Sequence, residues 1–163
     1  MNTNMKPSIC LRSAAIFLTL SLALAGLTAR ELVPFKGSLQ GHENDVLNFP
    51  QLLVDGAVMG VATHVGRFTM TYKVTVTLPA GTSTGSAVLT AANGDTILTT
   101  IVGVGVLLPD GLNSITEINT ITGGTGRFAG AKGSFTVDRL EDPATGVTSG
   151  TIINGLITSP GVE

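Results

Sequence analysis

The clearest pattern in the chain is an alternation of apolar and polar residues between Phe68 and Leu78. Four threonines and Lys73 separate the apolar positions, which are Phe68, Met70, Tyr72, Val74, Val76 and Leu78. A period of two places successive side chains on opposite faces of a β-strand. The pattern therefore predicts a strand with a hydrated threonine face and a buried face that carries Met70, Tyr72 and Val74.

Turn signals divide the rest of the chain into seven more short strands. Asn93-Gly94-Asp95 is typical of a tight hairpin, because Asn and Gly tolerate positive φ. Further turns are expected at 109–111 and 142–146, which are rich in Pro, Asp and Gly. The expected strands are 34–42, 57–65, 68–78, 85–92, 96–107, 114–122, 132–140 and 147–158. This pattern predicts an all-β fold, a single eight-stranded antiparallel barrel of calycin-like type, with a two-sheet sandwich as the alternative.

One expected connection, residues 43–56, is longer than the others and contains several apolar residues. A loop of this length and composition packs against the barrel in one of two ways. It covers one mouth as a lid, or it lies on the outer wall. The sequence leaves these two alternatives open.

A run of glycines between residues 121 and 135 brackets one Arg-Phe pair. The spacing does not match a phosphate-binding glycine loop, and no Gly-Lys-Ser/Thr sequence follows. A structural role fits better. Glycines permit a tight turn with unusual backbone angles, and Phe128 can plug one barrel end. The structural residues are Gly123, Gly124, Gly126, Phe128, Gly130 and Gly133, and the last two let the next strand start close to its neighbour.

The same run, read as Gly-Gly-Thr-Gly-Arg-Phe-Ala-Gly-Ala-Lys-Gly, resembles a segment of the allene oxide cyclase and dirigent β-barrels. The resemblance covers residues 119–135 and implies an eight-stranded barrel in an exported, bacterial-type member of that superfamily. It also implies self-association, since these families form dimers or trimers. Those proteins use charged and polar groups inside the barrel, but the matched segment assigns no such residue here.

The N-terminal 29 residues have the features of an export signal. Lys6 and Arg12 form a basic region, and residues 14–25 form an apolar run too short to span a bilayer. We expect cleavage between Gly26 and Arg30, a barrel domain at 30–163, and a periplasmic or extracellular location. An uncleaved anchor is the alternative. Cys10, the single cysteine, falls inside this segment, so the rest of the chain has no thiol.

Charge narrows the classes of partner. Lys6 and Arg12 fall in the signal, which leaves 7 Lys and Arg against 11 Asp and Glu after residue 29. These charges are scattered and form no basic stripe, so we expect no nucleic-acid partner. We also expect no stable membrane span and no cofactor.

Three polar residues are candidates for a ligand site inside the barrel. Tyr72 shares the apolar face of its strand, and its hydroxyl needs a hydrogen-bond partner if buried. Glu117 would be a candidate general acid or base if it faced inward, but we expect it to point outward because buried glutamates are rare. Arg139 shares a face with Phe135 and Val137, and either pairs with Glu117 or extends to a strand end. With Met70 and Val74, these residues form the predicted ligand-binding set.

Other chemistry has little support in the sequence. His42-Glu43-Asn44-Asp45 gathers metal-capable side chains, but neighbours on one loop rarely complete a site, and we expect no metal. No serine- or cysteine-based catalytic arrangement is present. Three functions remain: a barrel that binds a small apolar or amphipathic molecule, a cyclase- or isomerase-like enzyme, or a filled structural or oligomeric module. The first is favoured because the expected interior is mostly apolar.

Overall fold

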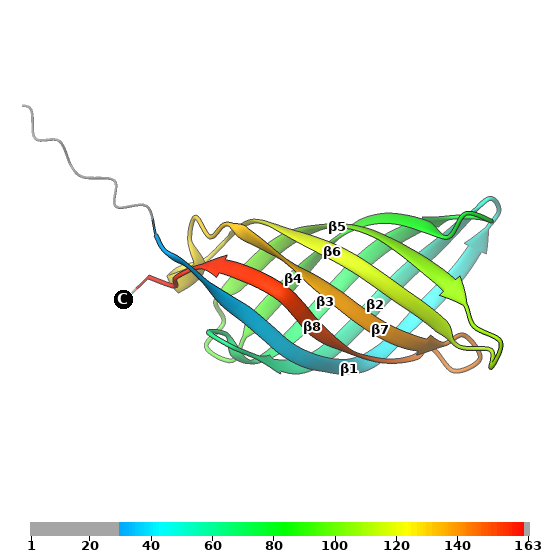
Figure 1. Ribbon diagram of the computed structural model, residues 1–163, viewed down its shortest axis with the longest axis horizontal. Coiled ribbons are helices and arrows are strands. Elements are labelled where there is room, and N and C mark those ends of the chain that lie inside the picture. Colours follow the sequence, from blue (N-terminus) through cyan, green and yellow to red (C-terminus); the bar gives the residue numbers. More distant parts are fainter. Residues whose placement is uncertain (1–29, 162–163) are drawn as a thin grey trace, which may run out of the picture.

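The computed structural model describes residues 30–161, which form one closed barrel of eight antiparallel strands in sequence order (Figure 1). A short 3-10 helix, η1 (Gly126–Phe128), follows the sixth strand. The strands are β1 (Leu32–Asn48), β2 (Gln51–Ala62), β3 (Gly66–Thr77), β4 (Thr82–Ala91), β5 (Thr96–Leu107), β6 (Asn113–Gly124), β7 (Gly133–Asp142) and β8 (Val147–Thr158). The predicted signal peptide lies outside the described residues.

The barrel closes because β1 pairs with β2 on one side and with β8 on the other. Along the closing seam, Leu32 lies opposite Thr158 and His42 opposite Val147. Closure satisfies the backbone groups that an open sheet would leave at its two edges. The predicted barrel is therefore confirmed, and the alternative of a two-sheet sandwich is wrong.

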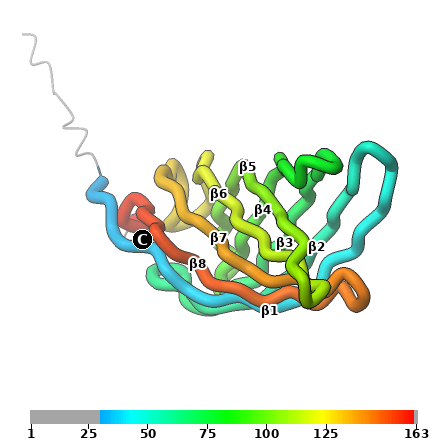
Figure 2. The backbone as a smooth tube through the Cα atoms, turned by 45° about the vertical axis from the view of Figure 1, so that its right-hand side comes forward, coloured from blue at the N-terminus to red at the C-terminus, as the bar shows by residue number. Residues whose placement is uncertain are grey.

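The segment 43–56, expected to be a loop, is instead a hairpin. β1 continues to Asn48, a two-residue turn follows, and Gln51 opens β2 directly opposite Asn48. Figure 2 shows this hairpin reaching past the neighbouring turns, so it is neither a lid nor a loop packed on the wall. Its tip is exposed, with Phe49 at 75%. Sequence analysis missed it because the polar run at 43–45 interrupts the alternation, whereas a hydrogen-bonded ladder does not need apolar side chains.

The interior matches the expected alternation. Met70, Tyr72 and Val74 of β3 are all buried, while Thr71 and Lys73 between them face solvent. Phe35 and Phe135 meet edge to face inside the barrel, with ring centroids 5.0 Å apart. Leu39 and Phe128 are also buried.

The glycine run forms the tight connection that closes one barrel end. Gly126 has a φ of 54° and opens η1, whose Phe128 is fully buried. Gly133 lies so close to β8 that an added Cβ would collide with the backbone of Leu156. Gly126, Gly133 and Phe128 thus lie as a tight turn and plug require, whereas Gly123 and Gly124 have no positive φ. Gly130 differs from expectation, because nothing lies within 4 Å of an added Cβ there, and its φ of 70° explains the glycine instead.

Candidate functional site

The barrel end opposite Phe128 holds a pocket of about 220 Å³. Most of its wall is apolar and comes from β2, β3, β5 and β6, through Leu52, Val54, Val74, Val76, Leu107 and Ile115. Its polar side chains come mainly from β1, β6 and β7, and are Glu43, Asp45, Ser83, Asn113, Glu117, Arg139 and Glu141. The pocket thus combines an apolar wall with a charged lining.

Strand geometry explains why charged residues reach the interior. Glu117 shares a face of β6 with the buried Asn119 and Ile121, and Arg139 shares a face of β7 with Val137. The expectation that Glu117 points outward is wrong, since its side chain is buried. A buried carboxylate is tolerated here because the Arg139 guanidinium donates hydrogen bonds to it.

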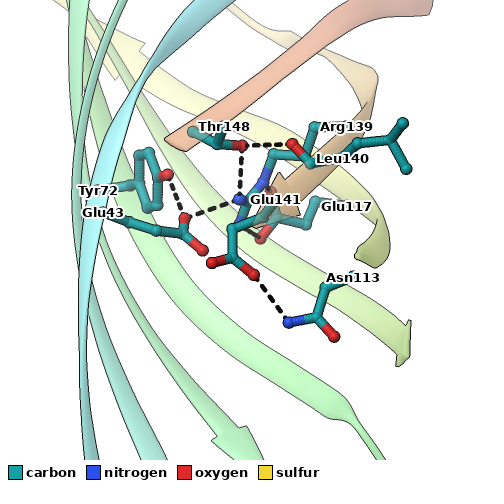
Figure 3. Close-up of polar contacts among 8 residues, drawn as sticks. All are labelled: Glu43, Tyr72, Asn113, Glu117, Arg139, Leu140, Glu141 and Thr148. Carbon is teal, nitrogen blue, oxygen red and sulfur yellow. Dashed lines mark hydrogen bonds and ion pairs between the residues drawn. The ribbon is translucent and has the colours of Figure 1, made fainter. Parts of the chain in front are cut away.

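Arg139 organises the charged cluster through four hydrogen bonds (Figure 3). Its Nε and Nη2 reach the two carboxylate oxygens of Glu117 at 3.1 and 3.3 Å. Its Nη1 donates to Glu43 at 2.7 Å and to the Thr148 hydroxyl at 3.1 Å. Burial alone would lower the pKa of Arg139, but the charge and hydrogen bonds of Glu117, with a smaller contribution from Glu43, raise the pKa. The guanidinium therefore stays charged, and each of its three nitrogens donates at least one hydrogen bond.

Tyr72 joins this cluster from β3. Its hydroxyl donates to Glu43 Oε2 at 2.5 Å, and the Arg139 guanidinium lies 5.3 Å from its ring centroid. Burial raises the pKa of Tyr72, so the phenol keeps its proton. Tyr72 is thus a hydrogen-bond donor and not a base. It lies beside Glu43 rather than in the pocket lining.

Two further carboxyls sit at the pocket and take no part in the Arg139 bonds. Glu141 is buried and accepts a 2.7 Å hydrogen bond from Asn113 Nδ2, and burial raises its pKa. Asp45 lies at the rim. The residue is exposed overall, but the protein around its carboxyl group, followed by the charges of Glu43 and Glu141, raises the pKa of Asp45 to about 6. The structure therefore gathers carboxyls that resist ionising together.

Carboxylate oxygens of Glu43, Asp45 and Glu141 lie within 4.8 Å of one another. Oxygen ligands of this kind suit a hard divalent cation. However, Glu43 already accepts hydrogen bonds from both Arg139 and Tyr72. His42, considered with these residues in the sequence, lies on the exposed face of β1 and is not part of the group.

Glycines in neighbouring strands make room for the large polar side chains. Gly56 of β2 lies opposite Tyr72, and a Cβ there would collide with the phenol ring. Gly150 of β8 lies opposite Arg139, and a Cβ there would collide with the Arg139 side chain. These close approaches require glycine irrespective of its φ.

Sequence analysis found part of this site. Of the predicted ligand-binding set, Val74, Glu117 and Arg139 line the pocket, whereas Met70 lies outside its lining. Glu141 was missed, although its position two residues after Arg139 places it on the same face of β7. The pairing of Gly56 with Tyr72 and of Gly150 with Arg139 depends on the strand register, which only the fold defines.

Among residues 30–161, no helix has the length and apolar character that crossing a membrane requires. Comparisons with known protein families, with curated proteins and with solved structures find no match for this chain.

Proposed function

We propose that this protein binds a small amphipathic molecule in the pocket at the barrel end opposite Phe128, which we call the mouth pocket. The apolar part of the ligand would lie against the wall of valine and leucine side chains. The observation that carries the proposal is the pocket itself, which combines an apolar wall with a charged lining. Ligand sites are typically concave, mostly apolar and supplied with a few placed polar groups. A volume of about 220 Å³ restricts the ligand to a compact molecule.

Binding without turnover is favoured because the central charged groups are already engaged. Arg139 forms hydrogen bonds with two carboxylates, and the protonated Tyr72 hydroxyl donates a hydrogen bond to Glu43. We further propose that the protein acts outside the cytoplasm and is related to the allene oxide cyclase and dirigent barrels. The export signal and the glycine run of the sequence support these two points.

The test of binding uses 1-hexanol, a six-carbon chain with one hydroxyl, titrated against isotope-labelled protein. We expect saturable NMR shifts confined to methyl groups of the pocket, such as those of Val74 and Val76. Val76→Trp should abolish these shifts by filling the half-buried mouth. Thr77→Trp, on the exposed face of the same strand, is the matched control and should leave binding intact.

A second candidate is an enzyme that moves a proton, and Glu141 is the residue that favours it. A buried carboxyl with a raised pKa in a pocket is a typical general acid or base. Such a group would remove a proton from the carbon beside a ketone and return one from water. The test is deuterium incorporation into 2-hexanone in D₂O. Exchange above the buffer rate that disappears in a folded Glu141→Gln variant would favour the enzyme over the binding protein.

A further inference from the structure

We infer that the ligand of the mouth pocket carries a positive charge, as a primary alkylammonium, and that its ammonium group binds beside Asp45 and Glu141. This inference rests on the proposed function and names the chemical class of its ligand. It is carried by the charge balance of the pocket together with an unpaired hydroxyl in its lining.

The pocket holds more negative than positive groups. Four carboxyls line it, those of Glu43, Asp45, Glu117 and Glu141, against the single guanidinium of Arg139. Arg139 forms ion pairs with Glu43 and Glu117. Within residues 30–161, Asp45 and Glu141 have no ion-pair partner. The mouth therefore carries an excess of negative charge.

The excess of negative charge affects the protonation of Asp45 and Glu141. Burial and the charge of Glu43 raise the pKa of both Asp45 and Glu141, so each competes for a proton as the pH falls. A bound cation would replace that proton and relieve the repulsion. An anionic head group, such as the carboxylate of a fatty acid, would add to the repulsion instead.

A separate observation comes from β4, on another side of the pocket. Ser83 lines the same pocket and is 6% exposed, yet its Oγ has no hydrogen-bond partner in the described part of the chain. A buried hydroxyl without a partner costs free energy unless something bonds it. A ligand whose polar group enters the pocket would supply that partner.

A primary ammonium fits these acceptors better than the other candidates. It has three N–H donors and no acceptor, which suits the carboxylates of Asp45 and Glu141, whose oxygens lie within 4.8 Å of one another. Its alkyl chain then lies against the wall formed by Leu52, Val74 and Val76. A bare divalent cation would satisfy the carboxylates but leave that wall uncovered.

The test compares three ligands that share one tail: hexylammonium, 1-hexanol and hexanoate. Calorimetric titration at pH 7.5 should give hexylammonium at least a tenfold higher affinity than 1-hexanol, and no binding of hexanoate. Asp45→Asn and Glu141→Gln should each weaken hexylammonium binding severalfold, and by a clearly larger factor than they change 1-hexanol binding. Asp55→Asn is the matched control, because Asp55 lies on the outer face paired with Lys73, and it should change neither affinity.

The affinity for hexylammonium should also depend on pH. Protonation of Asp45 removes a binding charge, so affinity should fall as the pH drops through about 6. The charged groups that act on Asp45 are Glu43 on the same strand and Glu141 and Arg139 from β7. Tyr72 from β3 and Glu117 from β6 bond the same cluster through Glu43 and Arg139. Binding of 1-hexanol should stay constant over the same range.

The outcomes separate the two proposals. Equal affinity for hexylammonium and 1-hexanol, or binding of hexanoate, would overturn the inference and leave the proposed function standing. No binding of any of the three would overturn the proposed function itself. Binding of Ca²⁺ that Asp45→Asn abolishes, without binding of hexylammonium, would assign the carboxyls to a metal and overturn the inference. Thermal unfolding of each variant confirms that it is folded.

Discussion

At the scale of single residues, Arg139 makes the charged interior of this barrel tolerable. A buried carboxylate loses its hydration and needs a partner of opposite charge or a proton. Arg139 gives Glu117 a two-point contact and gives Glu43 a third bond. One side chain thus holds together groups from β1, β6 and β7, and Tyr72 completes the set from β3.

Removal of that one charge should strongly destabilise the protein. We expect Arg139→Met to lower the free energy of unfolding by about 3–5 kcal/mol at neutral pH, because it leaves two buried carboxylates unpaired. Chemical denaturation at pH 7.5 measures the loss.

The matched control is Lys73→Met, which removes an ion pair on the outer face. Lys73 and Asp55 are both well exposed, at 80% and 62%, so their pairing contributes little. Stability should change by no more than about 0.5 kcal/mol. Equal losses for the two variants would contradict the role of Arg139.

At the scale of elements, two nearby glycines, Gly123 at the end of β6 and Gly126 in the connection to β7, have different roles. Gly126 has positive φ, and an added Cβ there would collide with the carboxylate of Asp95. Gly123 faces open space, with nothing within 4 Å of an added Cβ. The turn therefore depends on Gly126 and not on Gly123.

Alanine substitutions separate the two positions. Gly126→Ala should destabilise the fold by more than about 1 kcal/mol, because it combines backbone strain with a steric collision. Gly123→Ala should stay within about 0.5 kcal/mol of the parent protein. Thermal unfolding of the two variants side by side is the measurement. A loss at Gly123 as large as that at Gly126 would contradict this account.

The β1–β2 hairpin is the second element with a consequence of its own. Glu43 N donates to Gly146 O on the β8 side of β1, so by alternation the amide of Leu47 also points to that side. β1 has no partner there beyond His42 within the described strands. The amide of Val46 points the other way, toward its β2 partner Leu53.

Proline substitutions should report this difference directly, because proline has no amide hydrogen to donate. Val46→Pro removes a bond of the hairpin ladder and should destabilise the protein. Leu47→Pro removes an amide that faces solvent and should be tolerated much better. Hydrogen exchange of the amides of β2 gives the readout. Equal loss of protection in both variants would contradict this assignment, and a greater loss in Leu47→Pro would show that the two amides point the other way.

At the scale of the whole molecule, closure pairs every strand with two neighbours, so no strand can detach without breaking hydrogen bonds on both of its sides. The charged cluster spans this closed structure, since Glu43 and Arg139 are 96 positions apart in the chain. A site assembled from β1, β3, β6 and β7 depends on the complete barrel. It is expected to form and melt with it.

This dependence can be measured with the chain's own fluorescence. Tyr72 is the single tyrosine, and the sequence has no tryptophan, so emission reports on the site. We expect tyrosine fluorescence and far-UV circular dichroism to give the same unfolding midpoint. An earlier fluorescence transition would show that the mouth opens before the barrel unfolds.

The sequence by itself determined the features that depend on local geometry. Strand β3 and its buried face follow from a period of two, because the backbone pleat alone sends alternate side chains to opposite sides. The turn at Asn93-Gly94 and the role of Gly126 follow from the conformational freedom of these residue types. The closed barrel followed from eight such strands with short connections, because closure removes exposed edges.

The tertiary structure alone decided which polar residues meet. Periodicity places Glu117 on one face of its strand, but both faces are equivalent until the sheet curves and closes. Burial of Glu117 is then acceptable only because Arg139 comes from the next strand to meet it. The excess negative charge of the mouth likewise depends on Asp45 and Glu141, which are distant in sequence. Their shared environment exists only once β1 and β7 stand at the same end of the barrel.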